Sequence, residues 1–270
     1  MMNNQAIGFI DSGVGGLTVV KEALKQLPNE KIYYLGDTAR MPYGPRPSEQ
    51  VLEFTWEMTS FLLSKGIKML VIACNTATAA ALDDLREKLA IPVIGVIKPG
   101  SRAAIKSSKN QRVGVIGTEG TIKSGAYKRT LHEKNPNLFV TSLPCPEFVQ
   151  IVENDQYESK YAEQVVAETL GFFDDKNIDT LVMGCTHYPL LRPFIQKAVG
   201  DKVTLIDSGA ETVNDVSTIL DYFDIAAKRE EETTHEFYTT GSSDDFNEIA
   251  SGWLGLENIN AKTIHLGQGD

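Results

Sequence analysis

The sequence predicts an α/β protein of two similar domains, each with a mainly parallel four-stranded sheet flanked by helices. Short apolar runs alternate with longer helical patterns, which is the arrangement of β-α-β units and parallel sheets. The same alternation begins a second time near residue 113, so the second half of the chain resembles the first. We expect the active site in the cleft between the two domains.

In the first half, four apolar runs are predicted as strands and three segments as helices. The strands are expected at residues 7–10, 32–35, 69–73 and 92–97. One helix is expected from Leu17, because apolar residues recur on one face until Pro28 ends the pattern. The other two helices are expected at residues 48–64 and 77–89.

The second half repeats this order and then continues past it. Strands are predicted at residues 113–116, 138–143, 180–183 and 203–206. Helices are predicted to open at residues 118–121 and to occupy residues 159–176, 190–199, 212–223 and 245–254. A further strand is expected at residues 236–239, and the acidic run at residues 229–232 is interpreted as a solvated turn.

The internal repeat predicts the domain limits. Residues 7–10 align with residues 113–116, and residues 70–74 align with residues 181–185, so that Cys74 falls opposite Cys185. The segment after residue 207 has no counterpart at the start of the chain, and we expect it to pack back onto the first domain. The limits are therefore predicted as residues 1–97 with 207–270, and residues 98–206.

Composition limits the class of function. The net charge of −10 argues against general nucleic-acid binding, which needs a basic surface for phosphates. Three cysteines in 270 residues make no disulfide framework, and the sequence contains neither a signal peptide pattern nor an apolar run that spans a membrane. We expect a cytoplasmic protein that acts on a small molecule.

Polar residues that directly follow the predicted strands are the candidates for a site. In open parallel sheets, ligands bind outside the carboxyl ends of the strands. If the two domains face each other across a cleft, each contributes one thiol to it. The residues at these positions are Asp11, Ser12, Asp37, Cys74, Asn75, Thr76, Thr118, Cys185, Thr186, His187, Asp207 and Ser208.

Two acid/base groups on opposite faces of one carbon are what stereoinversion requires. Cysteine suits this work because its ordinary pKa of about 8.5 lies near neutral pH. We expect Asp11 and His187 to tune one thiol each, and a helix amino terminus at Ala77 to lower the pKa of Cys74. A single cysteine after a strand is more often a core residue, but the matched pair favours catalysis. The unmatched Cys145 is interpreted as core.

Three other interpretations fit the motifs less well. The turn at residues 11–16 lacks the spacing of a nucleotide-binding loop, so we interpret it as a tight turn whose N–H groups bind an anion. A zinc site built from Cys74, Cys185 and His187 would lack a closely spaced ligand pair. A cysteine phosphatase would need Arg six positions after its nucleophile, where this sequence has Leu191.

Five sequence blocks resemble the cofactor-independent aspartate/glutamate racemase family. They read IGFIDSGVGGLTV at residues 7–19, YLGDTARMPYG at 34–44, LVIACNTATA at 70–79, GVIGTEGTIKSGAY at 114–127 and LVMGCTHYPLL at 181–191. The resemblance implies two related α/β domains that enclose the substrate. It also implies interconversion of L- and D-glutamate without pyridoxal phosphate or metal, supplying D-glutamate for peptidoglycan in a homodimeric enzyme.

The resemblance also implies roles for individual residues. Cys74 is expected to deprotonate the D-enantiomer and Cys185 the L-enantiomer. Asp11, Asp37, Glu153 and His187 correspond to positions that assist the thiols. The substrate-binding positions implied are Asp11, Ser12, Tyr43, Gly44, Asn75, Thr76, Thr118, Thr121, Thr186 and His187.

Two alternatives to glutamate racemisation remain open at this point. Aspartate or another amino acid is a possible substrate, because one methylene in a pocket changes binding by only about 1–3 kcal/mol. A non-catalytic protein that closes on an amino acid is the second alternative, although such a protein has no use for a pair of thiols.

Overall fold

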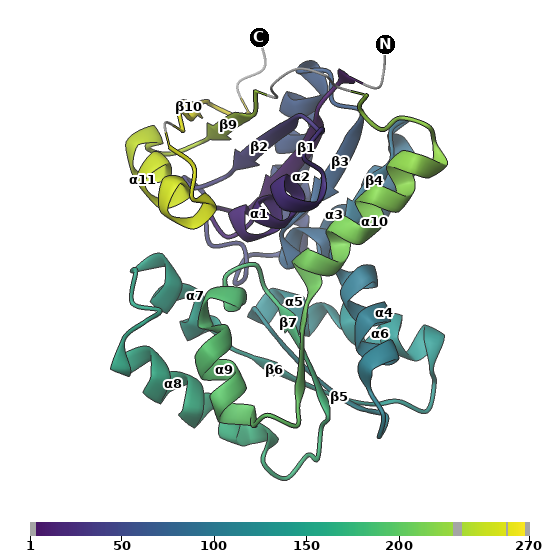
Figure 1. Cartoon of the computed structure of the whole chain (residues 1–270), viewed down its shortest axis with the longest axis vertical. Coiled ribbons are helices and arrows are strands. Elements are labelled where there is room, and N and C mark those ends of the chain that lie inside the picture. Colours follow the sequence, from purple (N-terminus) through teal and green to yellow (C-terminus); the bar gives the residue numbers. More distant parts are fainter. Residues whose placement is uncertain (1–3, 229–233, 258, 268–270) are drawn as a thin grey trace.

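Two parallel sheets form the framework of the protein and lie one above the other in Figure 1. The computed structural model describes residues 4–228, 234–257 and 259–267. The first sheet has the order β10-β9-β2-β1-β3-β4 and the second β6-β5-β7-β8, and all their strand pairs are parallel. The strands are β1 (Ile7–Asp11), β2 (Ile32–Gly36), β3 (Met69–Ile72), β4 (Val93–Gly95), β5 (Arg112–Gly117), β6 (Phe139–Pro144), β7 (Thr180–Gly184), β8 (Thr204–Asp207), β9 (Glu236–Thr239) and β10 (Lys262–Thr263).

Helices cover both faces of each sheet. We call the six-stranded sheet with α1, α2, α3, α10 and α11 the first lobe, and the four-stranded sheet with α4 to α9 the second lobe. None of the described helices is long and apolar enough to cross a membrane. The helices are α1 (Leu17–Gln26), α2 (Ser48–Ser64), α3 (Asn75–Lys88), α4 (Ile97–Ser107), α5 (Glu119–Ser124), α6 (Ala126–Lys134), α7 (Pro146–Glu153), α8 (Lys160–Leu170), α9 (Arg192–Val199), α10 (Ser208–Tyr222) and α11 (Ser243–Leu254), with short 3₁₀ turns η2 (Gly171–Phe173) and η3 (Tyr188–Leu191).

The two-sheet α/β class is confirmed, but the first sheet is larger than expected. Four strands were predicted for it, and six are present because the end of the chain adds to its edge. Strand β9 pairs with β2, and the unpredicted β10 pairs with β9. The acidic run at residues 229–232, interpreted above as a turn, lies outside the described residues.

The repeat seen in the sequence is a repeat of topology. The order β2-β1-β3-β4 in the first sheet matches β6-β5-β7-β8 in the second. Ile7 pairs with Met69 just as Val113 pairs with Thr180, so the aligned blocks occupy corresponding places. The chain leaves the first sheet after β4 and leaves the second after β8, and we propose residues 1–97 with 207–270, and 98–206, as the limits of the two domains.

Each sheet is buried on both faces, as expected for parallel strands flanked by helices. Because side chains alternate along a strand, Phe9 packs on one face of the first sheet and Ile10 on the other. The first face is covered by α1, α10 and α11, and Val213 and Val216 of α10 belong to its core. The end of the chain therefore does return to the first lobe.

Three helices were not predicted, two of them because of proline. Pro99 lies in the first turn of α4, and Pro146 begins α7. Proline usually indicates the end of a helix, because it has no N–H to donate. In the first turn this does not matter, since N–H groups there have no acceptor within the helix. Helix α6 follows Gly125, whose positive φ of 65° separates it from α5. These helices matter because α6 and α7 carry side chains that reach the site.

Candidate functional site

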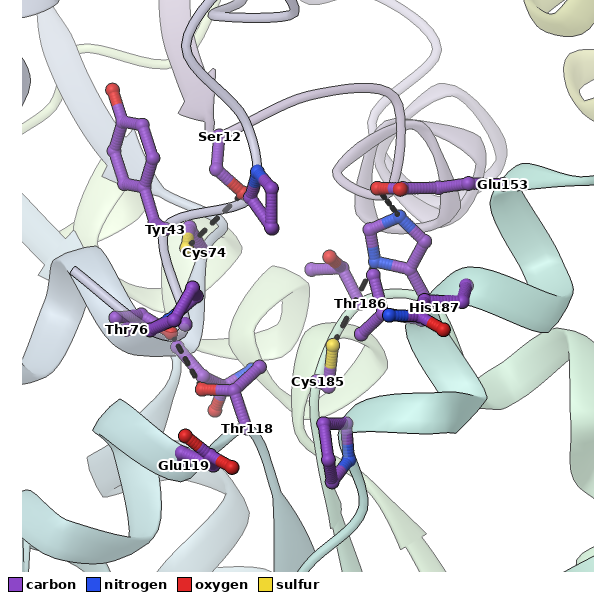
Figure 2. A pocket seen from close by; sticks show the side chains of 17 residues that line it. Ser12, Tyr43, Cys74, Thr76, Thr118, Glu119, Glu153, Cys185, Thr186 and His187 are labelled. Atoms are coloured by element: carbon purple, nitrogen blue, oxygen red, sulfur yellow. Dashed lines mark hydrogen bonds and ion pairs between the residues drawn. The ribbon is translucent and has the colours of Figure 1, made fainter.

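The carboxyl ends of the two sheets border one cavity of about 200 Å³, shown in Figure 2. Its size lies below the roughly 300–1,000 Å³ of drug-sized pockets, so it suits a small metabolite. Both lobes line it, with segments that follow β1 and β3 on one side and β5 and β7 on the other. The lining residues are Ser12, Pro42, Tyr43, Gly44, Pro45, Cys74, Asn75, Thr76, Thr118, Glu119, Pro146, Val149, Gln150, Glu153, Cys185, Thr186 and His187.

Cys74 lies between the end of β3 and the first turn of α3. Its Sγ accepts a hydrogen bond from the Ala77 N–H at 3.4 Å, and its thiol donates to Ser12 Oγ at 3.7 Å. Burial, followed by the nearby Asp11 carboxylate, raises the pKa of Cys74 to about 12. The Ala77 N–H lowers the pKa as expected, but burial and Asp11 outweigh it, so the net shift is upward.

Asp11 lies behind the cavity wall rather than in it. Its side chain is fully buried at the end of β1, where Oδ1 accepts the Gly13 N–H at 3.0 Å and Oδ2 accepts the Thr186 hydroxyl at 3.4 Å. Burial raises the pKa of Asp11, although His187 and the N–H groups of Gly16 and Gly13 oppose the rise. The residue therefore links the first lobe to the loop that carries Cys185.

On the other lobe, Cys185 directly follows β7 and faces an imidazole. His187 Nδ1 lies 3.7 Å from Cys185 Sγ. The opposite ring atom, Nε2, lies 3.3 Å from Glu153 Oε1, an ion-pair distance whose geometry falls short of a hydrogen bond. Figure 2 shows the carboxylate, the imidazole and the sulfur in a row.

The imidazole is held in its charged form. Burial opposes protonation, but the contacts with Cys185 and Glu153 outweigh burial and raise the pKa of His187 to about 10. At neutral pH the cavity thus has a cation beside one sulfur. The sequence placed His187 and Cys185 together by their spacing, whereas Glu153 reaches them from α7, more than thirty residues away.

Asp37 reaches the cavity through another side chain. It is fully buried and does not line the cavity. Its Oδ2 accepts the hydroxyl of Tyr43 and the Nε of Arg40, and its Oδ1 accepts the Thr240 hydroxyl at 2.8 Å. Tyr43 does line the cavity. In this structure Asp37 therefore orients Tyr43 and makes no contact with either sulfur.

Hydrogen bonds between the lobes frame the cavity on two sides. On one side the Thr76 hydroxyl lies 2.8 Å from that of Thr118 and 3.2 Å from that of Thr121. The Gly120 N–H also donates to the Gly44 carbonyl at 2.8 Å. On the other side the Thr18 hydroxyl donates to the Thr186 carbonyl at 2.9 Å. These contacts join the two lobes on both sides of the cavity.

The glycine-rich turn after β1 is close-packed rather than open. The Gly13 N–H is taken by Asp11, so it is not free for an anion. A side chain at Gly15 would bring its Cβ to 2.6 Å from the His187 ring, and one at Gly16 would meet Asp11 at the same distance. The glycines let the two lobes approach each other at this point.

Most of the residues that sequence reasoning selected line one cavity. Five of the selected residues do not line it: Asp11, Asp37, Thr121, Asp207, which caps α10, and Ser208, which begins that helix. Sequence reasoning missed six lining residues, of which only Glu119 had a signal, since it follows Thr118 at a strand end. The six missed residues are Pro42, Pro45, Glu119, Pro146, Val149 and Gln150.

In the described part of the chain, no three His, Cys, Asp or Glu side chains gather as metal ligands would.

Known sequences and structures resemble the chain over nearly its whole length. The profile of the family described as Asp/Glu/hydantoin racemase matches residues 7–216. A curated glutamate racemase of Carnobacterium sp. (strain St2) is 65% identical over 98% of this chain and 100% of its own length.

Two solved structures show the same fold. A glutamate racemase isoform of Bacillus anthracis has a TM-score of 0.94 at 48% identity, covering 97% of this chain and 98% of its own. A glutamate racemase of Francisella tularensis, solved with D-glutamate, has a TM-score of 0.91 at 37% identity, with the same coverage.

Proposed function

Because this chain belongs to the Asp/Glu/hydantoin racemase family, we propose that it interconverts L- and D-glutamate with Cys74 and Cys185 as its two acid/base groups. One observation carries the proposal. Each lobe supplies a thiol to the same cavity, after strands that occupy corresponding places in their sheets, and the sulfurs lie on opposite sides of the cavity in Figure 2. An α-carbon bound between them would present one face to each sulfur.

In the L-to-D direction, the Cys185 thiolate removes the Cα proton. The C–H bond breaks, its electron pair passes into the adjacent carboxyl group, and the sulfur gains the proton. The Cys74 thiol then gives its proton to the opposite face of the carbon. Protonated His187 lies beside Cys185, which starts this direction as a thiolate. The high pKa of Cys74 keeps its thiol protonated and ready to donate.

In the D-to-L direction the roles are exchanged. The Cys74 thiolate is less favourable because burial and Asp11 both disfavour the negative charge there. The Ala77 N–H and the Ser12 hydroxyl oppose this cost. Asp11, buried behind this wall, is the carboxylate that would balance the substrate's ammonium group bound on the Cys74 side.

Neutral donors suit a substrate with two carboxylates. The carbanion-like transition state places extra charge on the α-carboxylate, and preorganised donors in the cavity wall stabilise that charge. These steps need neither pyridoxal phosphate nor a metal ion, and we propose that the protein uses no cofactor. The side chains available as donors in the wall are Ser12, Asn75, Thr76 and Thr118, because the Tyr43 and Thr186 hydroxyls already donate to Asp37 and Asp11.

The test is proton exchange in D₂O with no cofactor added. We expect L- or D-glutamate to lose its Cα proton signal by NMR and its optical activity by circular dichroism. Cys74→Ser and Cys185→Ser should each abolish racemisation, with exchange surviving for one enantiomer at most. If either variant racemises at the wild-type rate, the two-thiol mechanism is wrong.

The third cysteine provides a matched control. Cys145 is buried outside the cavity, and its thiol donates to the Leu143 carbonyl at 3.7 Å. Cys145→Ser should therefore racemise glutamate at close to the wild-type rate. A loss as large as that of the other two variants would mean that serine at any buried cysteine disables the protein.

The same assay separates the alternatives. L-Aspartate should racemise much more slowly than L-glutamate, since the Carnobacterium relative at 65% identity is a glutamate racemase. Equal rates would favour a broader amino-acid racemase. Calorimetric binding of glutamate with no change of optical activity would favour the non-catalytic binding protein.

Three wider features belong to the same proposal. We propose that the product D-glutamate supplies peptidoglycan synthesis, that the protein acts in the cytoplasm, and that it is a homodimer. The free state of all three cysteines is compatible with a reducing compartment. Analytical ultracentrifugation tests the dimer, and a deletion strain rescued by external D-glutamate tests the supply role.

A further inference from the structure

A buried amide group in the cavity wall is left unsatisfied. Asn75 lines the cavity and is 3% exposed, and its Nδ2 has no hydrogen-bond partner among the described residues. Its Oδ1 is satisfied, because the Tyr127 hydroxyl donates to it at 2.7 Å. A buried unpaired amide nitrogen is costly, and such a group in a ligand cavity points to a missing acceptor.

Tyr127 approaches Asn75 from the other lobe. It lies in α6, is buried, and does not line the main cavity. Burial raises the pKa of Tyr127, which keeps the phenol neutral and able to donate. A Cβ at Gly184, the residue before Cys185, would come within 3.0 Å of its ring, so glycine there makes room for the tyrosine.

The hydroxyl also lies beside the two segments that connect the lobes. A Cβ at Gly100 in α4 would be 3.6 Å from the Tyr127 hydroxyl and 2.8 Å from Cβ of Ser208 in α10. Helices α4 and α10 begin where the chain crosses from one lobe to the other. The Tyr127 hydroxyl also interacts with Ser208 at the start of α10, so it lies between the connection and Asn75 of the cavity wall.

We propose that Tyr127 is a positioning residue that fixes the Asn75 amide with Oδ1 turned toward α6 and Nδ2 turned toward a substrate carboxylate. The inference rests on the proposed function, since it needs an anionic substrate in the cavity. An asparagine amide can rotate by half a turn at little steric cost, and the opposite orientation would place an oxygen against the carboxylate. The tyrosine hydroxyl holds the productive orientation because it donates to Oδ1 and so leaves both N–H groups of Nδ2 for the carboxylate. In the opposite orientation one of those N–H groups would donate to the phenol oxygen instead.

The first test removes only the hydroxyl. Tyr127→Phe should raise KM for L- and D-glutamate by about 3- to 10-fold, the range for one buried hydrogen bond. The value of kcat should change by less than about 2-fold, and the shape of its pH profile should not change. Tyr238→Phe is the control, because it removes another hydrogen-bonded tyrosine hydroxyl, bonded to Glu236 at 2.5 Å, away from the cavity. An unchanged KM in Tyr127→Phe, or an equal rise in the control, overturns the proposal.

A double-mutant cycle tests whether Tyr127 acts through Asn75. In an Asn75→Ala background, Tyr127→Phe should change KM by less than about 2-fold, because no amide remains to be oriented. The same 3- to 10-fold rise in that background would show that the hydroxyl acts elsewhere and would overturn the proposal.

A third variant tests the orientation even if Tyr127→Phe fails to fold. In Asn75→Asp, the tyrosine would hold one carboxylate oxygen and turn the other toward the substrate, so KM should exceed that of Asn75→Ala. An aspartate variant that binds glutamate as well as the alanine variant contradicts the assigned orientation. Failure of the proposed function is distinguishable, because the wild-type protein would then not racemise glutamate at all.

Discussion

His187 Nδ1 lies 3.7 Å from Cys185 Sγ, while the contacts of Cys74 are a helix N–H and a serine hydroxyl. Two cysteines at corresponding positions of a repeated fold thus have different surroundings. The reason is local: α3 begins directly after Cys74, whereas a loop containing Thr186 and His187 follows Cys185. In the proposed mechanism one cysteine starts as a thiolate and the other as a thiol, and these different surroundings suit those two protonation states.

The charge on His187 should be needed for catalysis. His187→Gln removes the cation beside Cys185, and kcat should fall by about 10²- to 10³-fold, the cost of losing one preorganised charge-stabilising group. Because enantiomers have equal free energies in water, kcat/KM must fall by the same factor in both directions. Circular dichroism from each enantiomer measures this, and a loss below about 3-fold would remove the imidazolium from the mechanism.

The same residue should make stability depend on pH. Its pKa is about 10 in the folded protein, above the ordinary value of about 6.5, so its stabilising contribution is complete below about pH 6.5. That contribution is lost as the pH rises toward 10. Urea unfolding of the wild type and His187→Gln should show a difference in unfolding free energy that shrinks from pH 6 to pH 10. A difference independent of pH would contradict a raised pKa.

Glu153 should act through the imidazole. The contact at 3.3 Å helps to raise the pKa of His187, so Glu153→Gln should lower that pKa and move the high-pH decline of kcat to lower pH. At pH 6, where the imidazole stays protonated, the variant should lose much less activity than at pH 9. Gln150→Ala, on the same helix and also at the cavity, tests whether any change on α7 has this effect; its pH profile should match that of the wild type.

Contact between the lobes should depend on the absence of a side chain at Gly120. A Cβ there would lie 2.7 Å from the Gly44 carbonyl, which accepts the Gly120 N–H. Gly120→Ala should therefore reduce kcat/KM about 10-fold, as strain of 1–3 kcal/mol displaces the cavity wall. Gly252→Ala is the control: it lies in α11 with nothing within 4 Å of the added carbon, and should stabilise the protein by about 0.5–1 kcal/mol with activity unchanged. Equal activity of both variants would refute the role of this contact.

A buried ion pair should anchor the return of the chain to the first lobe. Lys68 Nζ lies 2.6 Å from Glu30 Oε2 and donates to the Ile225 carbonyl at 2.7 Å, with both charged side chains almost fully buried. Lys68→Met leaves the carboxylate without its cation and should cost about 3–5 kcal/mol of unfolding free energy. Lys197→Met breaks an exposed pair with Glu163 and should cost less than about 1 kcal/mol. Similar costs in urea unfolding would contradict the distinction.

Much of the site was predictable because strand ends are visible in sequence. An apolar run that is buried on both faces must end where polar residues begin, and parallel pairing brings those ends to one edge of the sheet. That rule selected Cys74, Cys185 and six other residues of the wall, whereas Tyr43, Gly44 and Glu153 came only from the family resemblance. It missed Val149 and Gln150 because α7 opens with a proline next to Cys145, and that pattern reads as a loop.

The sequence by itself determined the two parallel sheets, the repeat that relates them and the pairing of Cys74 with Cys185, because the alternation of apolar runs with helical patterns is a local property of the chain. Only the tertiary structure decided that Glu153 meets His187, that Asp37 acts on Tyr43 and that Tyr127 holds Asn75. Each of these contacts joins side chains whose directions depend on packing between separate elements. No local pattern encodes such directions, and they decide which charges and donors face the substrate.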